Sequence, residues 1–187
     1  MSPILQIVPA NPLYGHQGFT IEGYWPTRFT AVCTTFLAKP EKRTLKGDFM
    51  HEAAVVNYLM TNFPHVETMN SYGYDMFFYR DERKLPFATL IASDYEHDNL
   101  SNLGRPGVFR LNIGISKKTF RALFGPVKLD MDSYDFTALD VIMPHPHYAQ
   151  YHFICVLSPS EATFAQIRPL LTEAYETAVR RYNRQNK

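Results

Sequence analysis

Hydrophobic and polar residues alternate with a clear period along residues 103–125, LGRPGVFRLNIGISKKTFRALFG. In the first half of this stretch every second residue is apolar, at Phe109, Leu111, Ile113 and Ile115. Arg110 and Asn112 lie between them and share the other face. A period of two predicts a β-strand at residues 108–115, with one face toward a core and one polar face open to a ligand or to water.

The same stretch continues as a short helix. Ser116 is a favourable N-cap, because its hydroxyl can accept a hydrogen bond from an unpaired backbone N–H. Phe120, Leu123 and Phe124 then follow the spacing of one helical face. Gly125 and the proline after it predict that the helix ends there.

Apolar periodicity predicts four further strands, at residues 66–71, 74–79, 85–93 and 151–157. Helical spacing predicts helices at residues 51–63 and 134–143 and a last one that reaches about residue 182. The last helix follows Ser158-Pro159-Ser160-Glu161, which has the form of a capping box, and Pro169 should kink or restart it. Short polar turns between the strands favour an antiparallel sheet. We therefore expect an α+β fold in which the N- and C-terminal helices pack on one face of the sheet.

The first 49 residues differ from the rest, because they contain five of the 13 prolines and four of the nine glycines. We expect residues 1–49 to be a loosely packed or poorly ordered N-terminal extension. Residues 50–187 should form a single α+β domain. An alternative is that the natural protein starts at Met50, so that residues 1–49 lie outside the native reading frame.

Composition narrows the function classes. The chain has 19 basic and 18 acidic residues, a balance that argues against a strongly electropositive nucleic-acid binder. Its two cysteines suggest neither a disulfide framework nor a metal cluster, which fits a reducing cytosol. The sequence shows neither an apolar run long enough for a membrane span nor a secretory signal. We expect a cytoplasmic protein without a membrane partner.

The polar face of the central strand is the leading candidate site. Arginine presents a fork of donors that suits anions, so Arg105, Arg110 and Asn112 could hold a small anionic ligand, with His145 and Asp94 nearby. Alternatively, Arg110 could pair with Asp75 or Asp94 across the sheet. We find no nucleophile elbow, phosphate-binding glycine loop or C-x-x-C pair. A non-catalytic ligand-binding or interaction domain without a cofactor, whose partner is an unknown small anion or a protein, is therefore favoured over an enzyme.

Two alternatives stay open. His145, His147 and His152 form an H-x-H-x4-H pattern, in which His145 and His147 could converge on zinc in a metal-dependent hydrolase. Further ligands would come from Asp140 or from the acidic loop of Asp94, Glu96 and Asp98. The bracketing prolines favour a structural role for His145, and the acidic loop could simply pair with Arg105. Nucleic acid could bind the basic surface of the predicted helix after Ser116, at Lys117, Lys118 and Arg121.

Several short motifs are typical of one family. They are Phe63-Pro64, Phe77-Phe78-Tyr79, Leu85-Pro86-Phe87-Ala88-Thr89, Ser93-Asp94, RPGVFRLNI at residues 105–113, Pro144-His145-Pro146 with Tyr148, Ser158-Pro159 and Leu170-Leu171. On these residues the chain from Met50 to about Tyr182 resembles a bacterial domain-of-unknown-function family, the one numbered 6194. More remotely, the order of elements resembles the MmcQ/YjbR group. That resemblance implies a CyaY-like α+β fold and, by analogy of shape alone, DNA binding.

Overall fold

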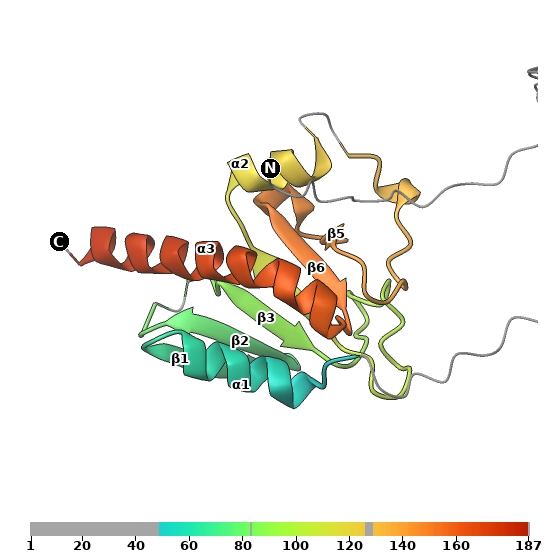
Figure 1. The fold of residues 1–187 in the computed structure, drawn as a ribbon, viewed down its shortest axis with the longest axis horizontal. Helices are drawn as coiled ribbons and strands as arrows, with labels where there is room; N and C mark the ends of the chain where they lie inside the picture. The colour runs from blue at the N-terminus through green and yellow to red at the C-terminus, as the bar shows by residue number, and fades with distance from the viewer. Residues whose placement is uncertain (1–48, 83, 126–128, 187) are drawn as a thin grey trace, which may run out of the picture.

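The computed structural model of the chain describes residues 49–82, 84–125 and 129–186 (Figure 1). Apart from Phe49, the predicted extension at residues 1–49 lies outside this part of the chain. The elements are α1 (Glu52–Asn62), β1 (Val66–Ser71), β2 (Tyr74–Tyr79), β3 (Ala88–Ile91), β4 (Arg110–Gly114), α2 (Lys117–Phe124), the 3-10 helix η1 (Met131–Ser133), β5 (Met143–Pro144), the 3-10 helix η2 (Ala149–Tyr151), β6 (Phe153–Leu157) and α3 (Glu161–Gln185).

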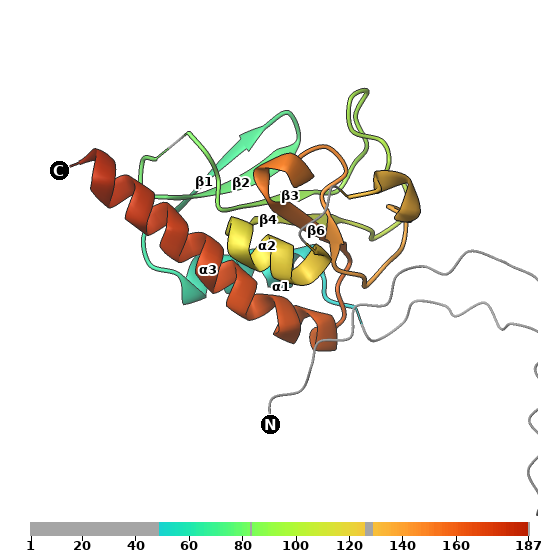
Figure 2. The same cartoon turned by 90° about the horizontal axis from the view of Figure 1, so that it is seen from above.

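The strands form one six-stranded antiparallel sheet in the order β1-β2-β3-β4-β6-β5. Helices α1 and α3 lie together on one side of it, as Figure 2 shows. The predicted α+β class is therefore confirmed. The predicted strands at residues 85–93, 108–115 and 151–157 are each shorter than expected, because the structure has β3, β4 and β6 at Ala88–Ile91, Arg110–Gly114 and Phe153–Leu157.

The main core lies between the sheet and these two helices. α1 contributes Val55 and Leu59, and α3 contributes a stripe that runs from Phe164 through Leu171 to Ala178. The sheet meets them with alternate residues of its central strands, among them Phe77, Leu90, Leu111, Ile113, Ile154 and Val156. These side chains are almost completely buried, and removing such apolar surface from water is the main favourable term in folding.

The N-cap of α3 differs from the prediction. The side chain of Ser160 accepts a hydrogen bond from the backbone N–H of Thr163 at 3.2 Å, so Ser160 is the cap. The side chain of Ser158, the predicted cap, instead accepts from the backbone N–H of Phe109, the residue before β4, at 3.2 Å. The helix also continues through Pro169 instead of restarting there. Among the described residues, no helix combines the length and the apolar character needed to cross a membrane.

The helix predicted at residues 134–143 is wrong. In this segment the side chain of Asp135 forms hydrogen bonds with nearby residues in a non-helical conformation, and such bonds compete with helix formation. The carboxylate of Asp135 accepts from the backbone N–H of Thr137 at 2.9 Å and from its hydroxyl at 2.6 Å. Asp140 follows with a positive φ of 64°, and its N–H donates to the Leu157 carbonyl at 2.8 Å. The segment is therefore a series of turns along the edge of the sheet.

Candidate functional site

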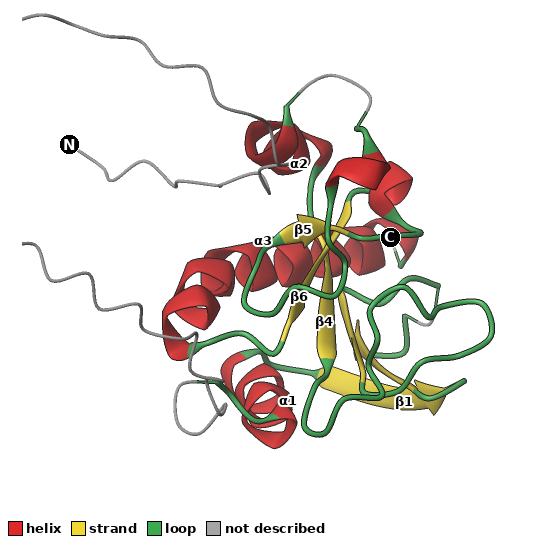
Figure 3. Ribbon diagram, turned by 90° about the vertical axis from the view of Figure 1, so that its right-hand side faces the viewer, coloured by secondary structure: helices red, strands yellow, loops and turns green. Residues whose placement is uncertain are grey.

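The second face of the sheet, opposite α1 and α3, carries the polar residues of the central strand. Strand pairing aligns one row across this face, which consists of Met69, Met76, Thr89, Asn112, Cys155 and Met143. Tyr74 and Arg110 belong to the next row. Loops lie on this side in Figure 3, whereas α1 and α3 lie on the other. The alternation of Arg110 and Asn112 with apolar core residues is therefore confirmed.

This polar face is not open along its whole length, because the loop before β4 covers Arg110 completely. Arg110 has no exposed surface, and its guanidinium forms a bidentate ion pair with Asp98. Nη1 also donates to the Ser101 hydroxyl at 2.8 Å, and Nε donates to Asn112 Oδ1 at 3.0 Å. The predicted pairing of Arg110 with Asp75 or Asp94 is therefore incorrect, because Asp98 is the partner.

Asp98 is the shared acceptor of the network. It receives hydrogen bonds from Arg110 and from the Tyr74 hydroxyl, and His147 Nε2 lies 3.5 Å from its Oδ1. Burial alone would raise the pKa of Asp98, but the hydrogen bonds and charge of Arg110 outweigh burial and lower it below the ordinary value. Burial and the neighbouring Asp98 together raise the pKa of Tyr74 far above its ordinary value. Arg110 and Asp98 therefore stay ionised, and Tyr74 keeps its proton.

His145 is buried beside this network with only 1% of its surface exposed. Its Nδ1 accepts the backbone N–H groups of His147 at 3.1 Å and Tyr148 at 3.2 Å. Backbone N–H groups only donate, so Nδ1 carries no proton and Nε2 carries the proton of the neutral ring. Burial first, and then the positive charge of Arg110, lower the pKa of His145 to about 3. The ring is therefore neutral near pH 7.

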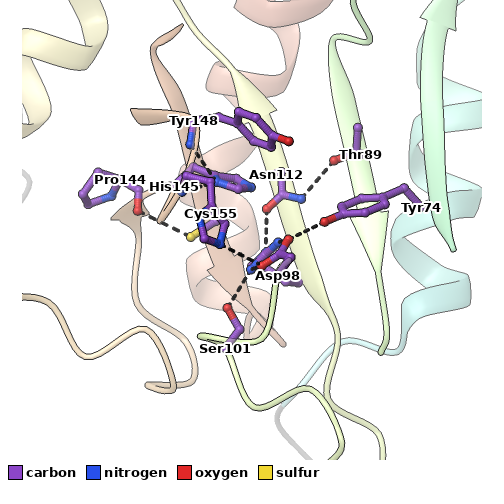
Figure 4. Close-up of polar contacts among 11 residues, drawn as sticks. Tyr74, Thr89, Asp98, Ser101, Asn112, Pro144, His145, Tyr148 and Cys155 are labelled. Atoms are coloured by element: carbon purple, nitrogen blue, oxygen red, sulfur yellow. Dashed lines mark hydrogen bonds and ion pairs between the residues drawn. The ribbon is translucent and has the colours of Figure 1, made fainter. Parts of the chain in front are cut away.

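A cleft of about 460 Å³ opens above this buried network. Its base is polar and consists of Thr89, Asn112 and His145, together with Tyr74. Its walls are largely apolar and consist of Met69, Met76, Phe78, Leu85, Pro86, Tyr148, Tyr151 and Phe153, with Lys84 as well. Figure 4 shows the base residues and their contacts. Concave, mostly apolar surfaces with a few convergent polar groups are the usual form of a small-molecule site.

Only some of the predicted site residues meet at this cleft. Asn112 and His145 line it, and Arg110 lies underneath without lining it. Arg105 lies elsewhere and donates to the backbone carbonyls of Asn102, Ser101 and Thr137. Asp94 does not line the cleft either. The structure therefore does not bring Arg105 and Asp94 to the cleft beside Asn112 and His145, and ligand binding at these predicted residues stays a prediction.

The histidines do not form a common metal centre in the described chain. Ring centroids of His145 and His147 are 6.2 Å apart, and Nδ1 of His145 is already used by two backbone donors. His152 turns away with a positive φ of 63° and packs against Phe120. Residues 49–82, 84–125 and 129–186 contain no group of three or more His, Cys, Asp or Glu side chains placed to hold a metal ion.

The basic residues predicted as a nucleic-acid surface lie on another part of the molecule. Lys117, Lys118 and Arg121 are exposed on α2. Lys117 and Arg121 border a shallow hollow of about 210 Å³, separate from the cleft. DNA binding by this helix stays a prediction.

Sequence reasoning missed several residues of the site. Thr89 and Met76 sit on strands whose register could not be assigned, although both occupy alternate positions that a correct register would have placed on the polar face. Tyr148 follows the Pro144-His145-Pro146 motif, and its ring centroid lies 4.8 Å from that of His145. Cys155 is in the same row as Asn112; it is completely buried, and burial raises the pKa of its thiol to about 12, so the thiol keeps its proton.

Fold and site together describe an α+β protein with a largely apolar cleft, polar at its base, on the face of an antiparallel sheet opposite α1 and α3. Residues 50–187 match the family described as "Family of unknown function (DUF6194)", which covers most of the chain, and the protein belongs to that family. The predicted family is thus confirmed. Comparison with curated proteins and with solved structures finds no match for this chain. The remoter YjbR-like relation stays a prediction.

Proposed function

We propose that the domain is a non-catalytic, small-molecule-binding module of the bacterial cytoplasm, and that its site is the cleft above Asn112 and His145. The observation that carries this proposal is the combination of apolar walls with buried polar side chains at the base of one cleft. An interaction surface for a protein would more commonly be flat and larger than this cleft.

The charged groups beneath the cleft support binding without catalysis. The carboxylate of Asp98 accepts hydrogen bonds from Arg110 and Tyr74. Around neutral pH the carboxyl group of Asp98 stays ionised and the hydroxyl of Tyr74 stays protonated. A general acid or base instead needs a pKa near the working pH and access to the substrate. His145 has access to the cleft, but its depressed pKa makes it a poor proton acceptor.

The charges of the residues in and below the cleft argue against the small anion that the sequence predicted as the ligand. Arg110 is neutralised by Asp98, so it cannot serve as the main anchor of an anion. Among the described residues that line the cleft, Lys84 is the only one with a full positive charge. The cleft therefore fits a ligand with an apolar body, to which Lys84 could add selectivity for a negative group.

A fragment screen by ligand-observed NMR on the full chain tests this function. Met76→Trp places a large ring in the cleft, and Met69→Trp does so from a position on the edge strand that is 37% exposed and tolerant of change. Met60→Trp is the matched control, because Met60 lies on α1 across the sheet and is 43% exposed.

Fragments that bind the wild type and Met60→Trp, but lose affinity in the folded cleft variants, support the proposal. A screen without hits, or hits that bind the cleft variants equally well, would overturn it.

A further inference from the structure

The base of the cleft presents hydrogen-bond donors, and this limits which molecules it can accept. His145 supplies the first donor. Because Nδ1 accepts two backbone N–H groups, the ring proton is on Nε2. Within the described chain, Nε2 has no hydrogen-bond acceptor, although the residue is 99% buried and lines the cleft. Nε2 does not belong to the completely buried side-chain atoms that lack a partner in the described chain, so this N–H reaches the cleft, where a ligand acceptor can take the place of water.

Asn112 supplies the second donor, and its amide orientation is determined by its neighbours. Arg110 Nε can only donate, so the oxygen of the Asn112 amide must face it, at 3.0 Å. The amide nitrogen therefore faces Thr89 and gives one of its two hydrogens to that hydroxyl at 2.9 Å. The second hydrogen has no acceptor among the described residues, and Asn112 also lines the cleft.

Thr89 adds a hydroxyl to the same base. Its oxygen accepts from Asn112, and no described residue accepts its proton. Three of the four polar side chains at the base, His145, Asn112 and Thr89, therefore have hydrogens to give, whereas Tyr74 gives its proton to Asp98. The carboxylate oxygens of Asp98 and the amide oxygen of Asn112 are already used by Arg110. Above the base, the side chains are flat or flexible and apolar, among them Tyr148, Phe153 and Met76.

We propose that the cleft takes a small molecule with a flat apolar body and an acceptor oxygen, a carbonyl or a carboxylate, which is bound by His145 Nε2–H and the Asn112 amide. This inference rests on the proposed function and adds the chemical class of the ligand. A cationic or purely donating head group finds only hydroxyl oxygens, those of Thr89 and Tyr74, as acceptors at the base, so it is discriminated against.

Four probes with one ring skeleton test the inference in the wild-type chain: 1-indanone, indane-2-carboxylate, indane and 2-aminoindane. Dissociation constants come from two-dimensional NMR titrations, in which cleft residues report the binding site. Two hydrogen bonds of about 1 kcal/mol each predict that 1-indanone binds at least about tenfold more tightly than indane. Indane-2-carboxylate should share this preference, and 2-aminoindane should bind most weakly. The ratio of carboxylate to ketone affinity measures the contribution of Lys84.

His145→Asn tests the donor itself. The asparagine oxygen can accept the backbone N–H groups that Nδ1 accepts, so the loop keeps its turn, but the donor at Nε2 is lost. We expect the affinity for 1-indanone to fall at least about fivefold and that for indane to stay within twofold. His145→Gln is the matched control, since its amide nitrogen can replace the Nε2 donor.

The outcomes separate the inference from the proposed function. If indane or 2-aminoindane binds the cleft as tightly as 1-indanone, the ligand class is incorrect although binding at the cleft stands. An unchanged preference in folded His145→Asn would exclude the assigned donor. If none of the four probes binds, the ligand class is likewise overturned, and the fragment screen alone decides whether the cleft binds small molecules.

Discussion

Acid should destabilise this protein through His145 at a pH where most carboxylates are still ionised. The ring is buried and neutral, and its protonation in the folded state would place a positive charge next to Arg110. In the unfolded chain the same ring is exposed to water and protonates at its ordinary pKa. Lowering the pH therefore favours the unfolded state, which binds one proton more than the folded state.

The magnitude follows from the two pKa values, 6.5 for an ordinary histidine and about 3 for His145 in the fold. Because the pKa in the folded state is the lower one, stability is complete above pH 6.5 and falls as the pH drops through the window from 6.5 to 3. Integrated between pH 7.5 and pH 5, the difference in bound protons lowers the free energy of unfolding by about 2 kcal/mol.

Urea denaturation at a series of pH values from 7.5 to 5 measures this effect, with His145→Asn as the reference. The variant keeps the other titrating side chains, so the difference between the two curves isolates His145. We expect the free energy of unfolding of the wild type to fall by about 2 kcal/mol more than that of the variant. Parallel curves would refute the claim that His145 is buried and neutral.

Two further predictions concern buried ion pairs. Asp98→Asn removes the countercharge of Arg110, a residue with no exposed surface. The free energy of unfolding, measured by urea denaturation, should fall by about 3 kcal/mol. A loss below about 1 kcal/mol would contradict the buried pair. Arg181→Met leaves the carboxylate of Glu82, only 5% exposed, without its partner and should cost about 2–4 kcal/mol by the same assay. Its control, Arg180→Met, breaks an exposed helical pair with Glu176 and an exposed hydrogen bond to the Thr177 hydroxyl, and should cost no more than about 0.5 kcal/mol. Equal losses in the two variants would show that the pair with Glu82 is not special.

Much of the fold could be predicted from local patterns. The period of two at residues 108–115 gave both the strand and its two faces, since the side chains of a strand must alternate. Ser116 and Gly125 gave both ends of α2, because each satisfies backbone groups of the helix in the structure. The pattern failed at residues 134–143, where helical spacing of apolar residues competed with Asp135 and its side-chain hydrogen bonds to Thr137.

The candidate site was only partly predictable, because its contacts are not local. Asn112 and His145 could be selected from their positions, yet the burial of Arg110 depends on a loop that starts beyond β3. In that loop the backbones of Tyr95 and Asp98 bind each other at 2.9 and 3.1 Å. This turn determines which carboxylate of the acidic loop, Asp94, Glu96 or Asp98, reaches Arg110. No rule based on sequence spacing distinguishes Asp98 from Asp94.

The buried ion pair has a role in this fold that stability alone does not explain. Apolar residues of similar volume often replace such a pair without loss of stability. Here, however, Arg110 is what orients the Asn112 amide, because its Nε must meet the amide oxygen. Asp98 in turn holds the guanidinium from the other side and leaves it no net charge to offer a ligand. Arg110, neutralised by Asp98, therefore positions the Asn112 amide as an uncharged hydrogen-bond donor. Recognition at the cleft then depends on hydrogen bonds and apolar contact instead of charge.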